Sequence, residues 1–495
     1  MPMAKEREKK LFLIGSLGNY AAELKLLLTT LLLLCGVATL LQFLPSRFTI
    51  SSSDLRFCIS RVSSQQPLPS SLLSTPPPPL SATPSSSNDT TIIKRAFKPY
   101  GSAAYNFITM GAYRGGPNTF AIVGLASKPL HVYAKPTYEC QWVPLPPHQN
   151  STSTTGYKIL PDWGYGHVYT VVVVNCTFNH TAPNADNAGG TLLLRASTSG
   201  GGDALLNATD TIEVLRETPG TLNASIFASE PKYDYFYCGS SLFGDLNPQR
   251  VREWIAYHVR FFGPRSHFVI HDAGGVHPAV LEVLKPWMEL GYVTLQDIRE
   301  QERFDGYYHN QFMVVNDCLH RYKFMAKWMF FFDVDEYIYV PPKSTIKSVL
   351  HSLSEYSQFT IEQMPMSSQI CLSQDYGKTH RKWGFEKLVF RDNIRGIRRD
   401  RKYAVQPRNL YATGVHMSQD LAGNTTHKTE GRIMYFHYHG SIAERNESCK
   451  ILVNSTQFTH EKIPFVLDTT LRNIAGVIKK FELKMIGSRL QKTRQ

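Results

Sequence analysis

A five-residue apolar segment, 328–332, runs directly into the carboxylates Asp333 and Asp335, and this junction constrains the fold more than any other feature. Upstream of it, β-branched or aromatic segments alternate with segments whose apolar residues recur at helical spacing. The predicted strands are 233–238, 267–271, 292–298 and 328–332, and the predicted helices are 248–262, 278–290 and 311–322. Strands that alternate with helices predict a mostly parallel sheet in a doubly wound α/β domain, here spanning 231–495.

Asp333 and Asp335 follow the last of these strands at its carboxyl end, which is where α/β sheets bind their ligands. Side chains alternate along a strand, so both carboxylates are expected on the same side. Two carboxylates there can hold a divalent cation through oxygen ligands, and the cation can offset the charge of a diphosphate leaving group. A solvated acidic turn is the alternative, but the position in the α/β series favours the metal site.

The one long apolar run, Leu26–Leu44, is just long enough to cross the hydrocarbon core of a bilayer. Lysines and arginines gather on its N-terminal side, which predicts a cytoplasmic N-terminus at 1–25. A cleaved signal peptide is the alternative, but no small-residue cleavage site follows the run. We therefore predict a single-pass type II protein with its C-terminal domains in the lumen.

Nine N-glycosylation sequons follow the apolar run, all on its C-terminal side. They begin at Asn88, Asn150, Asn175, Asn179, Asn207, Asn223, Asn424, Asn446 and Asn454. Their number agrees with a lumenal location. The net charge of +13 is compatible with a polyanionic partner, but the lumen excludes nucleic acid as that partner.

Eight cysteines are present, and none forms a C-x-x-C pair, so zinc and thioredoxin-like sites are disfavoured. An oxidising lumen makes disulfides the default for the six cysteines that lie well beyond the membrane. Of the 15 ways to pair six cysteines, we predict only Cys140–Cys176, because both residues fall in one candidate domain.

Residues 45–91 are rich in serine and proline and predict an extended stem. From 92 to 230, β-branched and aromatic runs punctuated by glycine and proline predict an antiparallel β-sandwich. Four aromatic residues in it could stack on sugar rings, which would make it a carbohydrate-binding domain: Trp142, Tyr157, Trp163 and Tyr165. For each of them, ordinary packing is the competing interpretation.

Four segments between about 230 and 470 resemble glycosyltransferase family 92, which has the GT-A fold. They are REWIAYH at 252–258, NDCL at 316–319, FDVDEYI at 332–338 and FHYH at 436–439. The layout, with its β-rich domain first, looks like that of the plant galactan synthases of this family. Where many members have a glycine-rich segment, 363–371 reads QMPMSSQIC, which departs from the pattern.

The resemblance implies a function that the spacing of residues does not. It implies transfer of galactose from UDP-galactose, with Mn²⁺ as cofactor and inversion at the anomeric carbon. The acceptor would be β-1,4-galactan on the pectin rhamnogalacturonan I, and the enzyme would lie in the Golgi membrane and could form a homodimer. Two alternatives stay open: the same fold with another donor such as UDP-arabinopyranose, and an inactive lectin-like scaffold.

GT-A enzymes usually complete the metal site with a late histidine, and His437 matches the family position. Asp333, Asp335 and His437 are therefore the predicted metal ligands. The donor is expected at the ends of the first strands, where Asp333 would take part with Cys238, Gly239, Ser240, His271, Asp272 and Arg303. Arg303 could meet phosphate through its planar guanidinium, although a plain surface charge is an equal alternative.

Inversion needs one carboxylate that takes the proton from the acceptor hydroxyl, and it cannot be a metal ligand. Downstream candidates are Glu362, Asp375, Glu386 and Asp392. We choose Glu386, because it follows the apolar Trp383-Gly384-Phe385 and lies nearest the family position, and place Asp375 second, in a polar loop open to solvent. The basic stretch 391–408 is either a dock for an anion or a solvated surface.

Overall fold

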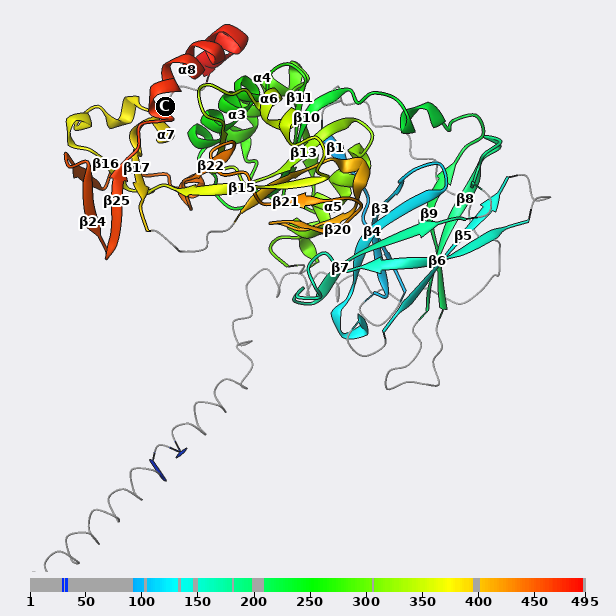
Figure 1. Ribbon diagram of the computed structural model, residues 1–495. Coiled ribbons are helices and arrows are strands. Elements are labelled where there is room, and N and C mark those ends of the chain that lie inside the picture. The colour runs from blue at the N-terminus through cyan, green and yellow to red at the C-terminus, as the bar shows by residue number, and fades with distance from the viewer. Residues whose placement is uncertain are drawn as a thin grey trace, which may run out of the picture. The chain divides into compact units, whose positions relative to one another are not determined.

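The computed structural model describes residues 29, 30, 32, 33, 92–101, 105–131, 135–145, 150–179, 182–197, 209–304, 307–394 and 401–492 (Figure 1). The predicted stem and nearly all of the predicted membrane anchor, 26–44, lie outside these residues. Within them, no helix is both long and apolar enough to cross a membrane. The described residues from 92 onwards belong to one compact unit, 86–495.

A ten-stranded mixed sheet forms the centre of the second half of the chain, in the order β1-β12-β11-β10-β13-β18-β15-β22-β14, with β21 paired to β15. From β1 to β13 all neighbours are parallel, and β18 then runs antiparallel to both β13 and β15. The strands are β1 Ile92–Lys94, β10 Tyr233–Leu242, β11 Ser266–Asp272, β12 Val293–Asp297, β13 Ala326–Phe331, β14 Glu336–Tyr339, β15 Gln358–Pro365, β18 Lys402–Val405, β21 Thr425–Thr426 and β22 Met434–His437.

Three helices begin and end close to the predicted residues: α3 Pro248–Phe262, α4 Pro278–Glu289 and α5 Gln311–Tyr322. Three further helices were not predicted: α6 Ile346–Ser352, α7 Gly384–Lys387 and α8 Arg472–Ile486. Helix α3 illustrates why: the Asn247 side chain accepts the Gln249 N–H at 2.9 Å, Pro248 opens the first turn, and Gly263 ends the helix with φ of 80°. The alternation of strands and helices up to β13 is therefore confirmed.

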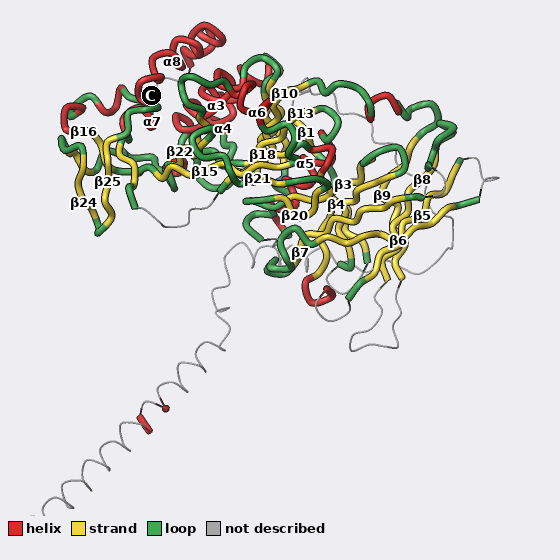
Figure 2. The backbone as a smooth tube through the Cα atoms, viewed as in Figure 1, coloured by secondary structure: helices red, strands yellow, loops and turns green. Residues whose placement is uncertain are grey.

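The preceding region is an antiparallel sheet of eight strands, seen as the yellow strands β3 to β9 in Figure 2. The strands are β2 Lys98–Tyr100, β3 Phe107–Arg114, β4 Thr119–Ser127, β5 Thr137–Pro144, β6 Thr152–Ile159, β7 Tyr169–Thr177, β8 Gly190–Ser197 and β9 Thr209–Glu217. Their order, β2-β3-β4-β7-β6-β5-β8-β9, is a single continuous ladder that encloses its own apolar core. The predicted two-sheet sandwich is thus not confirmed, although the β-rich character is.

The four aromatic residues singled out in this region separate into two groups. Trp142 is 3% exposed and stacks on Phe120, so of its two interpretations ordinary packing holds and it is a core residue. Tyr157, Trp163 and Tyr165 are 57–67% exposed. Their exposure leaves sugar binding by these three as a prediction.

Strand β1 belongs to the larger sheet, although its residues directly precede the β-rich region. Ile92 pairs with Leu295 and Lys94 with Asp297 in a parallel ladder with β12. The chain therefore enters the ten-stranded sheet, leaves it to build the eight-stranded sheet, and returns at β10.

A buried ionic cluster and a shared apolar core join the eight-stranded sheet to α5. Asp317 on α5 is fully buried and accepts hydrogen bonds from Arg95 Nη1 (2.7 Å), Arg321 Nη2 (2.7 Å) and the Tyr113 hydroxyl on β3. One apolar cluster contains residues of both parts, among them Ile108, Val123 and Val171 of the sheet and Phe312, Met313 and Val314 of α5. The two parts therefore share one core.

Three disulfides are present among the described cysteines. Cys140–Cys176 joins β5 to β7, as predicted. Cys238–Cys318 fastens β10 to α5, and Cys371–Cys449 fastens β16 (Ile370–Leu372) to the segment before β23 (Ile451–Val453). The two remaining cysteines, Cys35 and Cys58, lie outside the described residues.

Candidate functional site

The two predicted metal carboxylates lie just beyond β13, at the carboxyl edge of the parallel strands. Asp333 is held from three directions: Ser240 on β10 donates its hydroxyl to Oδ1, Lys402 Nζ lies 2.7 Å from Oδ2, and its own N–H donates to Glu336 Oε2 at 2.7 Å. Ser240 was predicted as a donor contact, and the structure brings it to the predicted metal site. This aspartate has a fixed orientation.

Asp335 faces His437 at the end of β22. Its Oδ1 lies 3.7 Å from His437 Nε2, and its Oδ2 accepts the Gly440 N–H at 3.1 Å. The Gln363 amide bonds the other ring nitrogen, Nδ1, at 2.5 Å, which directs Nε2 toward Asp335. β14 and β22 bring the two residues together, because Glu336 and His437 are register partners.

The two aspartates differ in charge behaviour although they are two residues apart. Burial raises the pKa of Asp333, but the ammonium of Lys402 and the hydrogen bonds from Lys402 and Ser240 outweigh it and bring the pKa to about 2. Burial, and then the negative charge of Asp333, raise the pKa of Asp335 to about 7. The site thus holds one carboxylate compensated by Lys402 and one, Asp335, that faces the imidazole of His437.

Whether the site suits a metal ion depends on its donor atoms. Among the residues that the structure describes, no group of three or more histidine, cysteine, aspartate or glutamate side chains is arranged to hold a metal. The facing atoms of Asp335 and His437, 3.7 Å apart, have the spacing of two ligands that each bind one ion at about 2.1 Å. These two residues therefore fit a divalent cation, whereas Asp333 is directed at Lys402.

Lys402, the first residue of β18, is a site residue that the sequence analysis did not identify. Its side chain is 3% exposed, and its Nζ contacts Asp333 and lies 3.7 Å from Glu336 Oε2. Burial lowers its pKa, but the carboxylates of Asp333 and Glu336 outweigh burial and raise the pKa above the ordinary value. The basic stretch 391–408 was the available signal, but nothing in its sequence distinguishes this buried lysine from the arginines around it.

The predicted donor contacts at β10 and β11 have different roles. Gly239 lies in the irregular part of the β10–β11 ladder, and its carbonyl accepts the His271 Nδ1 hydrogen at 3.0 Å. His271 Nε2 is buried without a hydrogen-bond partner among the described residues, and burial lowers the pKa of this histidine to about 4, so the ring is neutral and not accessible to a donor. The thiol of Cys238 is used in the disulfide with Cys318, so it cannot contact a donor, contrary to the prediction.

Two further predicted contacts lie at the ends of β11 and β12. Asp272 accepts the N–H groups of Gly274 (2.8 Å) and Val276 (3.0 Å) and so holds the turn before α4. Arg303 follows β12 and is exposed, and its guanidinium forms no hydrogen bond or ion pair with the described residues. Its guanidinium is accessible to a phosphate group.

The two candidate bases lie in settings that differ from those predicted. Asp375 is 4% exposed rather than open to solvent, because Arg472 donates to both of its oxygens (2.7 and 3.0 Å) and Lys382 lies at 3.3 Å. Burial raises its pKa, but these cations outweigh burial and lower it. Glu386 contacts Lys479 and lies 4.0 Å from Lys382, so its setting is charged rather than apolar. Arg472 and Lys479 both belong to α8.

Of the remaining downstream carboxylates, Glu362 lies half-buried on β15 and Asp392 ends β17 (Phe390–Asp392). Residues 395–400 of the basic stretch lie outside the described residues.

Comparison with known proteins places this geometry in a family. Residues 233–482 match the sequence model of a family described as glycosyltransferase family 92. The chain belongs to glycosyltransferase family 92. Two Arabidopsis thaliana proteins named galactan β-1,4-galactosyltransferase, GALS3 and GALS2, are each 60% identical to it, and the alignments cover 100% of both chains. A third, GALS1, is 53% identical over 80% of this chain and 79% of its own.

The family 92 match begins at the first residue of β10 and ends within α8. It therefore contains Asp333, Asp335, Lys402 and His437, and it leaves the eight-stranded sheet outside. The similarity to GALS3 and GALS2 includes that sheet as well, since it extends over the whole chain. This family 92 chain is accordingly a glycosyltransferase, and the resemblance noted in the sequence is confirmed.

Proposed function

We propose that this chain transfers galactose from UDP-galactose to the 4-hydroxyl of β-1,4-galactan, the side chain of the pectin rhamnogalacturonan I. The observation that carries the proposal is the 60% identity, over complete chains, to two proteins named galactan β-1,4-galactosyltransferase. Ser240 near the end of β10, Asp272 at the end of β11 and Asp333 just beyond β13 support a GT-A type nucleotide-sugar site. The proposed location is the Golgi membrane, with the transferase domain in the lumen.

The reaction is proposed to invert the anomeric carbon in a single displacement that depends on a divalent metal, with Mn²⁺ as the expected ion. Asp335 and His437 would hold the metal, which supplies the positive charge that offsets the diphosphate as it leaves. Ser240 and Lys402 fix Asp333 beside them, and Arg303 is accessible to a phosphate.

A donor screen tests this proposal. The purified full-length chain, with Mn²⁺ and a short β-1,4-galactan acceptor, is incubated with a panel of UDP-sugars, and chain elongation is followed by mass spectrometry. UDP-galactose is expected to give products longer by one hexose, and a β-1,4-galactosidase is expected to remove the added sugars. Preferred use of UDP-arabinopyranose, or no transfer from any donor, would contradict the proposed function.

Glu386 is proposed as the general base, with Asp375 second. Asp375 has both oxygens bound by Arg472, whereas Glu386 Oε1 has only Lys382, at 4.0 Å. Glu386→Gln is expected to lower the transfer rate by about two orders of magnitude, the usual contribution of general-base catalysis, with UDP affinity unchanged. The transfer rate is measured as the rate of UDP release. The matched control is Glu362→Gln, which changes a half-buried carboxylate on β15 in the same way. Normal turnover in Glu386→Gln, together with an inactive but folded Asp375→Asn, would move the assignment to Asp375.

N-glycosylation tests the lumenal location and the local structure together. Six described sequon asparagines are exposed: Asn150, Asn179, Asn223, Asn424, Asn446 and Asn454. Asn175 is half-buried on β7 and donates to the Tyr411 carbonyl at 3.3 Å, so we expect it to carry no glycan. Endoglycosidase should lower the mass of the protein from a plant host, and peptide mapping should find Asn175 unmodified. An unshifted mass would contradict the lumenal location.

A further inference from the structure

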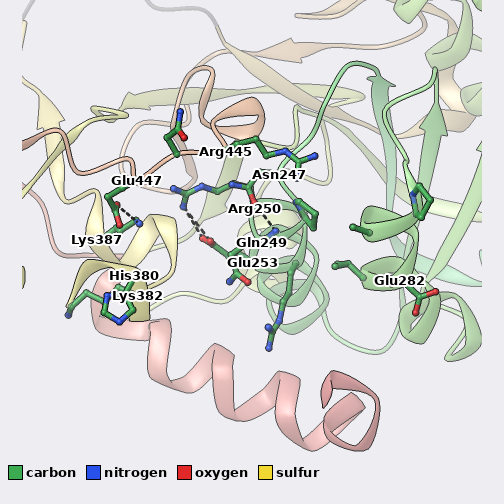
Figure 3. Close-up of a pocket in the computed structure, with 16 residues that line it drawn as sticks. Asn247, Gln249, Arg250, Glu253, Glu282, His380, Lys382, Lys387, Arg445 and Glu447 are labelled. Atoms are coloured by element: carbon green, nitrogen blue, oxygen red, sulfur yellow. Dashed lines mark hydrogen bonds and ion pairs between the residues drawn. The ribbon is translucent and has the colours of Figure 1, made fainter. Parts of the chain in front are cut away.

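A cavity of about 680 Å³ is lined by none of the proposed donor or metal contacts, and of the residues named in the catalytic proposal it includes Lys382, the neighbour of Glu386 (Figure 3). Its lining comes from the starts of α3 and α4, from the 380–387 segment and from the 445–447 loop. None of Asp333, Asp335 and His437 lines it. A volume of several hundred cubic ångströms is typical of small-molecule sites and is far larger than a single phosphate needs.

The charges around this cavity favour an anion. Five arginine and lysine side chains line it against three glutamates. Figure 3 shows Arg250 on α3, Lys382 and Lys387 on the 380–387 segment, and Arg445 on the loop above them. The N-termini of α3 and α4 also open onto it, and the N-cap of α4, His277, gives no side-chain hydrogen bond to its helix. Helix N-termini carry partial positive charge and add to this preference.

Two of the cations pair with carboxylates that solvent reaches. Arg445 is itself 40% exposed and contacts the exposed Asp245, whereas Lys387 is buried and its Nζ lies 2.6 Å from the partly exposed Glu447. Arg250 is also buried, and it is held by Glu253 and by the Ser448 hydroxyl at 2.6 Å. Arg250 thus forms the fixed floor, while Arg445 and Lys387 can exchange a solvated partner for a ligand.

The same lining offers hydrogen-bond acceptors and amides that a simple anion would not use. Glu282 and Glu447 can accept hydroxyl hydrogens, and Gln249 and Asn446 can both donate and accept. A ligand that pairs with the cations and also uses these polar groups must carry both an acidic group and hydroxyl groups. The cavity volume lies within the roughly 300–1,000 Å³ of ordinary ligand sites, which corresponds to a ligand of about two to three sugar rings.

We propose that this cavity binds an acidic oligosaccharide, in which the carboxylate of a uronic acid meets Arg445 and Lys387. The site is separate from the donor site, so it goes beyond the proposed transfer reaction. Through it the enzyme would bind a charged glycan, which need not be the chain that is being elongated. Inorganic phosphate is also an anion and could bind the same cations, so its binding is compared with that of the acidic oligosaccharide.

Binding is measured by calorimetry on the purified full-length protein, so the result does not depend on catalytic activity. The probes are trigalacturonate, its fully methyl-esterified form, β-1,4-galactotriose and inorganic phosphate. The protein is first treated with endoglycosidase, because Asn446 is both a sequon and a lining residue. Trigalacturonate is expected to bind, its affinity should fall as salt rises, and the methyl ester, which keeps the rings and loses the charge, should bind at least about tenfold more weakly.

Two variants, expected to change the affinity for trigalacturonate in opposite directions, locate the site. Arg445→Gln removes an exposed cation and should weaken trigalacturonate binding about tenfold, the value of one charge-assisted contact. Glu447→Gln removes a carboxylate beside Lys387 and should strengthen binding about threefold, a gain that misfolding cannot imitate. Arg216→Gln, on exposed β9, is the matched control and should change nothing.

Three results would overturn the proposal. The first is equal affinity for trigalacturonate and its methyl ester. The second is unchanged trigalacturonate binding in Arg445→Gln. The third is loss of phosphate binding, but not of trigalacturonate binding, in that variant, which would make the cavity a phosphate site.

Discussion

Asp335→Asn is expected to lower the rate of galactosyl transfer at least about a thousandfold, because a metal that offsets a leaving diphosphate contributes several kcal/mol and each 1.4 kcal/mol is a factor of ten. The substitution keeps the shape of the side chain and an oxygen for the Gly440 N–H. It removes the charge from the carboxylate that faces His437. The rate is measured as incorporation of labelled galactose into a galactan acceptor.

The control for this experiment is Asp234→Asn, which removes a carboxylate at the opposite end of the sheet, where Asp234 pairs with the exposed Arg265. It should transfer galactose normally. Mn²⁺ binding, followed by electron paramagnetic resonance, should be lost in Asp335→Asn and weakened in His437→Ala. Full activity of the unmodified enzyme in excess chelator would contradict the metal-dependent mechanism.

Asp317→Asn is expected to cost about 3–5 kcal/mol of stability, the usual effect of removing one partner from a buried ion pair. The side chain has no exposed surface, and its loss of charge leaves Arg95 and Arg321 without their shared carboxylate. The size of the side chain does not change, so no cavity contributes. Thermal and urea unfolding measure the difference, and the melting temperature should fall by several degrees.

The matched control is Asp234→Asn again, because its ion pair with Arg265 is exposed and such pairs contribute about 0–1 kcal/mol. Adding Arg95→Met to Asp317→Asn should recover part of the loss, since it removes one of the uncompensated charges. A loss below about 1 kcal/mol in Asp317→Asn would mean that solvent reaches the cluster and that it does not fasten α5 to the β-rich sheet.

The parallel half of the catalytic sheet was predictable because its signals are local. Helix α3 has its cap, its proline and its terminal glycine within the segment itself, and the apolar strand β13 leads straight into Asp333. The Cys140–Cys176 pair was predictable for a related reason, since both residues lie in one β-rich region.

The rest of the site depends on contacts between residues far apart in the chain. Lys402 reaches Asp333 only because β18 inserts between β13 and β15, and no local pattern encodes that insertion. Glu386 follows an apolar tripeptide, but Lys479, contributed by the last helix, makes its setting charged. Cys238 gave no sign that Cys318 would use its thiol, because the pairing requires α5 to pack on β10.

The pairing of β1 with β12 has a consequence for synthesis of the chain. Ile92 emerges from the ribosome before the whole eight-stranded sheet, and its partner Leu295 emerges after it. A protein that folds as it is made would complete the β-rich sheet while β1 is still an unpaired strand. Unpaired strands recruit other chains, so this interval is when chaperones are needed most. The catalytic sheet is closed at this edge only once β12 has been made.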